Sequence, residues 1–478
     1  MPRNRSSLTP HLVLPVVWAL LLVLHTTATA QSNLPVIPIV PGFAVREIPV
    51  QLTNINNLHY SADGRLWALG YDGRIHILAD KDGDGLEETV KTWWTPKTAN
   101  AFRGPIGMIV ADDGVYVASK GKISLIKDSD NDGSADTEEI VTTGWKEILQ
   151  AVDATGLARD KEGNLYFCLG TTNFAEAYLL DKAGKSHYDL KSERGTIIKL
   201  SADRSKREIV ATGVRFAIGI GFNRHGDLFF TDQEGDTWTK GNHLDELNVL
   251  MPAPDGGPRH YGFPERHPVH LPGTNDEPPV VGFGPQHQST CGLKFNEPRE
   301  GFKTFGPKLW ENDALVIGES RGKIWRVPLV KVAGGYVGRQ HLIACTQMLT
   351  IDCSTSPAGD LAICCHSGPP DWGTGPTGNG RLFKISYVDK EAPQPVIAWP
   401  AARDEIRVAF HRPIDKYVES RVVGLTVSCG QFVRAGDRYE AMVPPYAIVR
   451  AQKQAAARDL KIQSAKLSED GRTLSLKV

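Results

Sequence analysis

Two short acidic segments carry the clearest chemistry in this sequence. Residues 128–139 read DSDNDGSADTEE, with carboxylates at positions 1, 3, 5, 9 and 12 of the segment and Gly133 at position 6. Oxygen-bearing side chains at this spacing, with a glycine at the sharp turn, are typical of a calcium loop. The segment therefore predicts a calcium site formed by Asp128, Asp130, Asp132, Asp136 and Glu139.

The same spacing occurs 48 residues earlier, in DKDGDGLEE. Gly85 takes the turn position and Lys91 stands where the last carboxylate would be, so the predicted ligands are Asp80, Asp82, Asp84 and Glu88. Because carboxylates this close repel one another without a cation, we expect calcium to bind both loops and to stabilise the fold. The alternative for each loop is an acidic, solvated turn that holds no ion.

Apolar and polar residues alternate on both sides of each loop. RIHILAD and GKISLIKD precede the loops, and ETVKTWW and EEIVTTGW follow them. A period of two predicts strands, and hence a β-hairpin in place of the helix pair of an EF-hand. A hairpin that recurs after about 48 residues is typical of the blades of a β-propeller.

Six similar units, each with a turn followed by a short apolar strand, extend from residue 52 to about residue 387. They contain residues 61–70, 110–120, 159–170, 223–235, 311–327 and 357–368. The 47 glycines and 31 prolines favour a turn-rich, all-β protein. We therefore predict a six-bladed β-propeller over residues 41–388. Residues 41–50 would supply the outer strand of the last blade, which removes an exposed sheet edge.

The residue pattern changes after Asp389, where several prolines are followed by further segments of alternating apolar and polar residues. This pattern predicts a small β-sandwich-like module over residues 389–478. Its last hairpin runs to the final residue, so either the module closes there or the chain stops short of what followed.

Residues 1–30 are typical of an export signal. Arg3 and Arg5 precede a short apolar core, LVLPVVWALLLVL, and Ala28–Ala30 form a small-residue cleavage site. The core is too short to span a bilayer as a helix, and no later segment is apolar enough to do so. We expect an exported protein, periplasmic or extracellular, without a membrane span after cleavage; an uncleaved anchor is the alternative.

Charge and cysteine content exclude some functions. The formal net charge of −1 provides no basic surface for nucleic acid. Cys364, Cys365 and His366 do not form the C-x-x-C-H motif of a c-type haem site, so we expect no haem in this chain. The seven cysteines are an odd number, which leaves at least one thiol unpaired within the chain, and the adjacent pair is expected to be buried at the end of a strand.

One blade carries a family resemblance. GVRFAIGIGFNRHGDLFFTDQEG, followed by LDELNVLMP and HYGFP, resembles the propellers of the glucose/sorbosone dehydrogenase family. The stretch HSGPPDWGTGPTGNGRLFKI is similar to the last blade of exported proteins described as membrane-bound dehydrogenases, which often also carry a cytochrome c domain. The resemblance implies a quinoprotein-type oxidoreductase module with pyrroloquinoline quinone over the central channel, a sugar or polysaccharide substrate, and a cytochrome c domain or protein as partner.

The resemblance also implies roles for individual residues. Arg215 takes the position of the family's cofactor arginine, and Arg321, Lys323 and Arg381 supply further cations for the carboxylates of the quinone. The alternative for each is an ion pair at the surface or between blades. The family's catalytic histidine has no counterpart in residues 150–167, where Asp153 is the candidate general base and a turn or capping role is the alternative.

Two other functions remain open at this stage. A metal-dependent, lactonase-like hydrolase would use oxygen ligands near the ends of the inner strands: Asn57, Asp153, Asp232 and Glu319. A non-catalytic propeller that binds carbohydrate or protein would use aromatic residues of its long loops: Trp238, Tyr261, Phe263 and Trp372. For a propeller of the resembling family, the missing histidine leaves two expectations, an active oxidoreductase of the glucose/sorbosone dehydrogenase type or a catalytically inactive relative.

Overall fold

The computed structural model describes residues 34–98, 101–149, 152–171, 181–185, 187, 189–233, 244–251, 253, 256–263, 279–284, 288–370, 378–420, 425–431, 450–451 and 454–478. The predicted export signal lies outside these residues. The described chain divides into two compact units, which separate between Glu391 and Ala392. None of the helices within the described ranges is long and apolar enough to cross a membrane.

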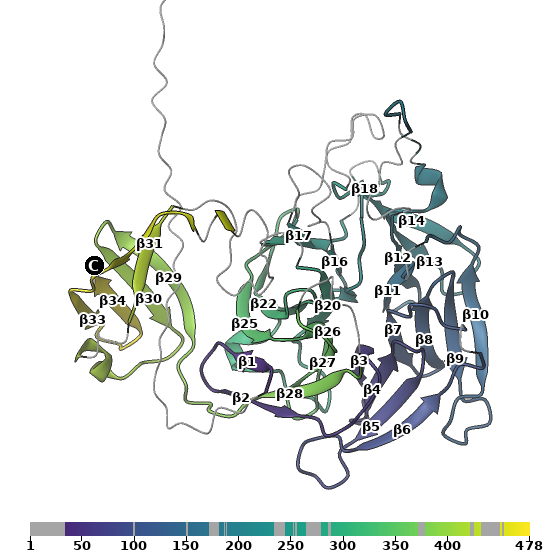
Figure 1. Cartoon of the computed structure of the whole chain (residues 1–478), viewed down its shortest axis with the longest axis horizontal. Coiled ribbons are helices and arrows are strands. Elements are labelled where there is room, and N and C mark those ends of the chain that lie inside the picture. The colour runs from purple at the N-terminus through teal and green to yellow at the C-terminus, as the bar shows by residue number, and fades with distance from the viewer. Residues whose placement is uncertain are drawn as a thin grey trace, which may run out of the picture. The chain divides into compact units, whose positions relative to one another are not determined.

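The first unit is built from four-stranded antiparallel sheets, or blades, and the described residues form six of them (Figure 1). Blade 1 contains β3 (Ile55–Tyr60), β4 (Leu66–Gly70), β5 (Ile75–Ala79) and β6 (Thr89–Trp94). Blade 2 contains β7 (Met108–Ala111), β8 (Gly114–Ser119), β9 (Lys122–Lys127) and β10 (Thr137–Thr143). Blade 3 contains β11 (Ala154–Arg159), β12 (Leu165–Leu169), β13 (Thr196–Leu200) and β14 (Arg207–Thr212), with β18 (Arg259–His260) added in parallel to β14.

The remaining three blades follow the same order. Blade 4 contains β15 (Ile220–Phe222), β16 (Leu228–Asp232), β17 (Asp245–Val249) and β19 (Val281–Phe283). Blade 5 contains β20 (Thr290–Phe295), β21 (Ala314–Gly318), β22 (Lys323–Val327) and β25 (His341–Thr346), with a hairpin of β23 (Leu329–Val332) and β24 (Gly335–Gly338) inserted before β25. Blade 6 contains β26 (Leu349–Thr355), β27 (Leu361–His366), β28 (Arg381–Tyr387) and β2 (Phe43–Glu47).

The first strands of the blades form a closed ring. Each of β3, β7, β11, β15 and β20 contacts the first strand of the next blade, and β26 returns to contact β3. The prediction of an all-β, six-bladed propeller is therefore confirmed.

The turns between the first and second strands explain why the repeat could be recognised from sequence. In blade 1 the amide of Ser61 donates to the carbonyl of Arg65 at 3.0 Å, and the amide of Gly64 donates back to Ser61 at 2.9 Å. Gly64 has a φ of 84°, a left-handed conformation that favours glycine. The same pair of bonds recurs in blade 4 around Gly226 and in blade 6 around Gly359, so the glycine marks one repeated turn.

Strands from the N-terminal end complete the last two blades. β2 pairs with β28 in antiparallel register from Phe43 opposite Tyr387 to Glu47 opposite Phe383, as predicted from residues 41–50. β1 (Val36–Pro38) adds a fifth strand to blade 5 through β25. Phe43 stacks on Trp310 of blade 5, with ring centroids 5.0 Å apart. The closure therefore joins the start of the propeller to its last two blades.

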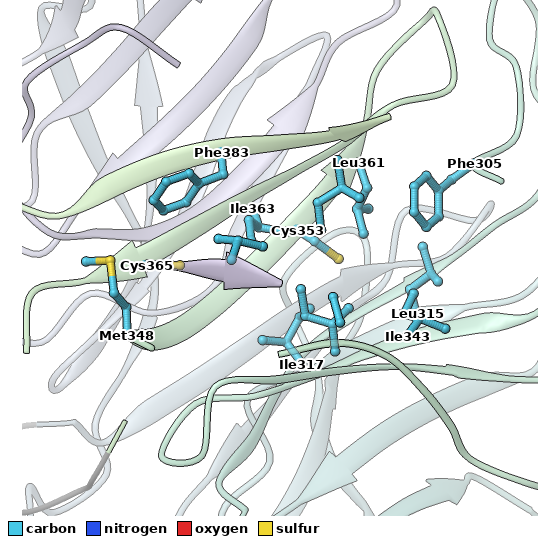
Figure 2. Packing of buried hydrophobic residues seen from close by; sticks show 14 of the residues in the cluster. Phe305, Leu315, Ile317, Ile343, Met348, Cys353, Leu361, Ile363, Cys365 and Phe383 are labelled. Atoms are coloured by element: carbon cyan, nitrogen blue, oxygen red, sulfur yellow. The ribbon is translucent and has the colours of Figure 1, made fainter. Parts of the chain in front are cut away.

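Apolar side chains fill the space between successive blades. Figure 2 shows this packing between blades 5 and 6, where Leu315 and Ile317 face residues such as Ile363 and Phe383. All seven cysteines fall within the described residues and none forms a disulfide. Cys365 belongs to the same cluster, and burial raises the pKa of its thiol to about 12. The predicted burial of the adjacent cysteines is confirmed, and they serve as packing residues.

The second unit is a small two-sheet module. One sheet has the order β29 (Pro395–Ala402), β30 (Glu405–Phe410), β34 (Thr473–Lys477) and β33 (Ser464–Leu467), and the other pairs β31 (Val427–Gly430) with β32 (Ala457–Leu460). Ile406, Val408, Leu474 and Leu476 of the larger sheet share a buried core with Val427 of the smaller one. This arrangement matches the predicted β-sandwich-like module.

We expect Phe43→Ala to weaken the ring closure, because Phe43 packs against Trp310, Phe305 and Tyr387 on two blades. Removing a partly buried aromatic ring should lower the free energy of unfolding by roughly 2 kcal/mol, measured by urea denaturation. Val330→Ala, on an exposed hairpin position, is the matched control and should change stability by less than about 0.5 kcal/mol. Equal effects of the two substitutions would contradict this role of Phe43.

Candidate functional site

The six inner strands line a narrow central channel. Asn57, Gly107, Gly219, Gly292 and Asp352 contribute to a cavity within it, one from each of five blades. The glycines let neighbouring strands approach closely: a Cβ atom at Gly219 would lie 2.3 Å from the carbonyl oxygen of Cys291. These positions therefore require glycine, and the channel stays narrow.

The polar groups inside the channel bond to one another. Asp352 Oδ2 accepts hydrogen bonds from Asn57 Nδ2 at 3.3 Å and from the amide of Leu58 at 3.1 Å, and it lies 3.5 Å from Lys294 Nζ. Asn57 Oδ1 accepts a bond from the amide of Gly107 at 2.8 Å. Asn57 thus links blades 6, 1 and 2 and has a structural role.

Buried charged residues gather at one end of the propeller. At this end β16 and β21 end and β20 begins, and the end is held together by bonds from Gln233 Nε2 to the carbonyl of Thr290 and from Thr290 Oγ1 to the carbonyl of Asp232, both 3.3 Å. We call it the Arg215 face. Three of the predicted cofactor cations belong to it, namely Arg215, Arg321 and Lys323, with exposed fractions of 4%, 1% and 0%.

Arg215 and Asp232 lie together on this face in blade 4. Arg215 Nη1 donates to the carbonyl of Gln233 at 2.5 Å, and its guanidinium lies 6.0 Å from the ring centre of Phe263. The backbone amides of Arg215 and Phe216 donate to the Asp232 carboxylate at 2.9 and 2.7 Å. Burial nevertheless raises the pKa of Asp232 to about 7. The geometry fixes this carboxylate in place against the backbone.

The cations of blade 5 lie in the turn after β21 and at the start of β22. Arg321 Nη1 donates to the carbonyl of Ser320 at 2.6 Å, and Ser320 Oγ bonds with Ser289 Oγ at 3.0 Å. Lys323 is fully buried although it lies within a strand. Charged side chains are rarely buried to this extent unless they are bonded to neighbouring groups. Contacts with neighbouring groups of this face therefore hold Arg321 and Lys323 in place.

Arg381 has a different role from the one implied by the resemblance. It begins β28 and forms a two-point ion pair with Glu47 of the neighbouring β2, with distances of 2.7 Å from Nε and 2.5 Å from Nη2. The pair lies between the two outer strands of blade 6. The structure therefore favours the alternative given above, an ion pair within the blade.

Asp153 is also engaged structurally. Its Oδ1 accepts a hydrogen bond from Arg194 Nη1, and its Oδ2 accepts bonds from Trp145 Nε1 at 3.0 Å and from the amide of Gly121 at 3.1 Å. Both charged residues of the pair are almost fully buried. A carboxylate held by a guanidinium and two further donors is poorly placed to accept a proton from substrate. The candidate base is therefore the acceptor of a buried ion pair, and Arg194 gave no signal in the sequence.

Two described histidines near this face are buried and bonded to the protein. His366 Nε2 bonds with Asn56 Oδ1 at 2.8 Å, and burial lowers the pKa of His366 to about 4. His260 Nδ1 accepts a bond from the amide of Gly262 at 3.1 Å. Both rings are buried and bonded to the protein.

The two alternative sets of residues are not assembled either. Within the described ranges, only the two acidic loops bring three His, Cys, Asp or Glu side chains close enough to share a metal ion. The oxygen ligands proposed for a hydrolase therefore do not gather into one site. Of the aromatic residues proposed for sugar stacking, Tyr261 and Phe263 are buried, and Tyr261 donates to the carbonyl of Val249 at 2.8 Å. Trp238 and Trp372 lie outside the described residues.

The first acidic loop connects β5 to β6, as the hairpin prediction requires. Ligand atoms of Asp80, Asp82 and Glu88 lie within 4.8 Å of one another. Asp80 accepts bonds from the amides of Gly83 and Gly85, both 2.7 Å, and Glu88 accepts bonds from the amide of Lys81. The Asp84 carboxylate accepts a bond from the amide of Leu86 at 2.7 Å and does not belong to the cluster of three.

The second loop connects β9 to β10 and repeats these contacts. Ligand atoms of Asp128, Asp130 and Asp132 lie within 4.8 Å of one another, and Asp136 accepts a bond from the amide of Ser129 as Glu88 does from Lys81. Glu139 differs from its prediction. It lies on β10 and pairs with Lys127 at 2.7 Å and with Arg204 of blade 3, which lowers the pKa of its carboxyl. The candidate ion ligands of this loop therefore lie at positions 1 to 9 and do not include position 12.

Both loops join neighbouring blades. Lys384 of blade 6 donates to the carbonyl of Gly85 at 2.6 Å, which ties the first loop to the closing blade. Lys91 of blade 1 donates to the carbonyl of Gly133, and the amide of Ala135 donates to the carbonyl of Trp93 at 2.6 Å. The loops thus lie on outer strands, away from the Arg215 face, and an ion in either loop would act on the stability of the ring.

Comparison with known proteins identifies the fold but does not identify a function. Residues 52–260 match the model of a domain of unknown function, DUF7133. An uncharacterized protein of Borreliella burgdorferi is 25% identical over 200 residues, which cover 39% of this chain and 50% of that protein. The chain therefore spans about half the length of this curated relative.

Solved structures of sugar-dehydrogenase propellers share the fold. An oxidoreductase (glucose dehydrogenase) from Thermus thermophilus has a TM-score of 0.51 at 17% identity, covering 72% of this chain and all of that one. The PQQ domain of pyranose dehydrogenase from Coprinopsis cinerea has a TM-score of 0.54 at 12% identity, covering 75% and 98%. A Trichoderma reesei member of carbohydrate-active enzyme family AA12, solved with calcium, has a TM-score of 0.55 at 14% identity, covering 76% and 99%. At these identities the likeness shows the fold alone.

We expect Asp153→Asn to destabilise the propeller strongly, because it leaves Arg194 buried without its carboxylate. The loss in free energy of unfolding should be about 3 kcal/mol by urea denaturation. Asp112→Asn, at an exposed position of blade 2, should change stability by less than about 0.5 kcal/mol. A small effect of Asp153→Asn would show that the pair is not a structural contact.

Proposed function

We propose that this chain is an exported, quinoprotein-type sugar dehydrogenase module whose cofactor site is the Arg215 face. The observation that carries the proposal is the presence of three buried cations, Arg215, Arg321 and Lys323, at one end of the propeller. Three cations brought together on one face can contact several carboxylates of one molecule, so a face of this kind is suited to an anionic ligand. The shared fold of the sugar-dehydrogenase propellers supports the choice of ligand.

The residues present fit pyrroloquinoline quinone in charge. Arg215, Arg321 and Lys323 would hold its three carboxylates, since guanidinium and ammonium groups are the usual partners of carboxylates. Arg381 does not join them because it is occupied by Glu47. When bound, this cofactor supplies a two-electron acceptor for the oxidation of a sugar. The chain's own contribution would be to bind the cofactor rigidly and to accept the proton released from the substrate.

The proposed function also includes a location, a substrate class and an electron acceptor. Residues 1–30 favour export to the periplasm or the cell exterior. The substrate would be a sugar or polysaccharide, and a cytochrome c domain or protein would receive the electrons, as the family resemblance implies. A module that binds the quinone without oxidising sugar would be a catalytically inactive relative of the same family.

The cofactor proposal predicts saturable quinone binding. Purified protein with calcium should develop a bound-quinone absorbance on titration with pyrroloquinoline quinone and should reduce a dye when sugar is added. Arg321→Met and Lys323→Met should each weaken quinone binding at least about tenfold, because each removes a charge-assisted contact. Arg381→Met is the matched control and should bind as the wild type does.

Absence of the bound-quinone absorbance would contradict the dehydrogenase function. A propeller that binds carbohydrate or protein would then be the better explanation. Binding without sugar-dependent dye reduction would instead identify the inactive relative. Equal losses in Arg381→Met and Arg321→Met would contradict the assignment of the Arg215 face.

We also propose that both acidic loops bind calcium and stabilise the outer strands. At a free calcium concentration of about 100 times Kd, each site would add about 2.7 kcal/mol to the free energy of unfolding, so a chelator should lower the melting temperature. Asp80→Asn with Asp128→Asn should remove most of this shift. Glu139→Gln should keep it, because Glu139 pairs with Lys127 and Arg204 outside the loop. A chelator without effect on the wild type would refute both calcium sites.

A further inference from the structure

Glu319 is a carboxylate that neither the fold nor the calcium loops use. It follows β21 directly and lies in the same short turn as Arg321, on the Arg215 face. Its backbone amide donates to the carbonyl of Ser289 at 3.0 Å, which fixes the turn against the start of β20. The side chain itself is partly exposed, unlike those of Asp153 and Asp232.

The Glu319 carboxylate receives no hydrogen bond from any group in the described part of the chain. This distinguishes it from the other carboxylates near the channel. Asp153 accepts bonds from Arg194 and Trp145, Asp232 from two backbone amides, and Asp352 from blade 1. A carboxylate that keeps its oxygens available can accept a proton from a bound molecule, whereas an engaged one cannot do so without losing its partners.

The carboxylate also lies close to the channel. Cys291 lines the channel cavity, and the nearby charge of Glu319 is, after burial, the largest cause of the raised pKa of its thiol. The other charged group that acts on this thiol is Asp352 of β26. On its own blade, Arg321 and Lys323 are the charged neighbours along the chain. Glu319 therefore shares a turn with Arg321 and lies near the thiol of Cys291, which lines the channel cavity.

We propose that Glu319 is the general base of this module, in the role that a histidine holds in the family. The inference rests on the proposed function. In the step it serves, the O–H bond of the sugar breaks and its proton moves to the Glu319 carboxylate. The C–H bond of the carbon that bears this hydroxyl breaks as well. The hydrogen leaves with the electron pair, as hydride, to an ortho-quinone oxidant, and a C=O bond forms at the carbon. The sugar loses two electrons and the oxidant gains them.

The protonation behaviour of Glu319 suits this role. Although part of the side chain reaches solvent, the protein atoms packed around it desolvate the carboxylate and raise the pKa of Glu319 to about 7. The group is then partly ionised at neutral pH and can both take up and release a proton. Because its pKa is higher in the folded than in the unfolded chain, the folded state loses stability as pH rises from the ordinary value of 4.5 through about 7. Glu319→Gln should remove this part of the pH dependence.

The test uses the full chain and four variants: Glu319→Gln, Glu319→Asp, Glu300→Gln as an exposed control on blade 5, and Arg321→Met. In the absence of cofactor, the carboxyl bands of the infrared spectrum should show two groups, Glu319 and Asp232, that titrate near pH 7 in the wild type and in Glu300→Gln. Only the contribution of Asp232 should remain in Glu319→Gln. Melting temperatures at pH 5 and pH 8 show whether each variant is folded. Glu319→Gln should gain stability relative to the wild type at pH 8.

With pyrroloquinoline quinone bound, Glu319→Gln should keep quinone affinity within about threefold of the wild type and lose dye reduction by on the order of 100-fold or more. The activity of the wild type should rise with pH through about 7, and Glu319→Asp should keep such a pH dependence at lower activity. Retention of activity and of the pH dependence in Glu319→Gln would overturn the role of Glu319 and leave the proposed function standing. Failure of the wild type to bind the quinone would overturn both.

Discussion

Closure of the ring of blades is the constraint on which the rest of this structure depends. Each blade buries apolar side chains on both faces against its neighbours, so no blade completes its own core. The ring closes where β2 pairs with β28, two segments more than 330 residues apart in the chain. Joining distant segments costs entropy that grows only slowly with the length between them, and the buried contacts of Phe43 and its neighbours offset that cost. The glycines of the inner strands then let the blades meet around a narrow channel.

A closed ring also explains how charged residues can be held inside a β protein. Arg194 and Asp153 satisfy one another at the inner end of blade 3, and Tyr60, Glu87 and Lys384 do the same between blades 1 and 6. Such groups are tolerated in the interior because the rigid strands present partners at fixed positions. The cations of the Arg215 face are held in the same rigid surroundings. A ligand that binds them would meet positions already set by the fold, which reduces the ordering needed on binding.

The sequence by itself determined the features that depend on neighbouring residues. Alternating side chains specify the strands, the glycine-containing turns specify the repeated hairpins, and the spacing from Asp80 to Glu88 specifies the loop geometry, because each is a matter of local backbone conformation. The closing strand could also be predicted, since an unpaired strand before the first blade and an open edge on the last imply one another.

Only the tertiary structure decided which distant side chains meet. Arg381 lies opposite Glu47 because β2 closes blade 6. Asp153 meets Arg194 across 41 residues because the blades bring the two strand ends together. Glu319 stands out for the opposite reason, since the structure leaves its carboxylate without a donor from the described chain. These contacts could not be predicted from the local sequence, because each residue type is compatible with many partners. Which partner it meets is fixed only when the ring of blades closes.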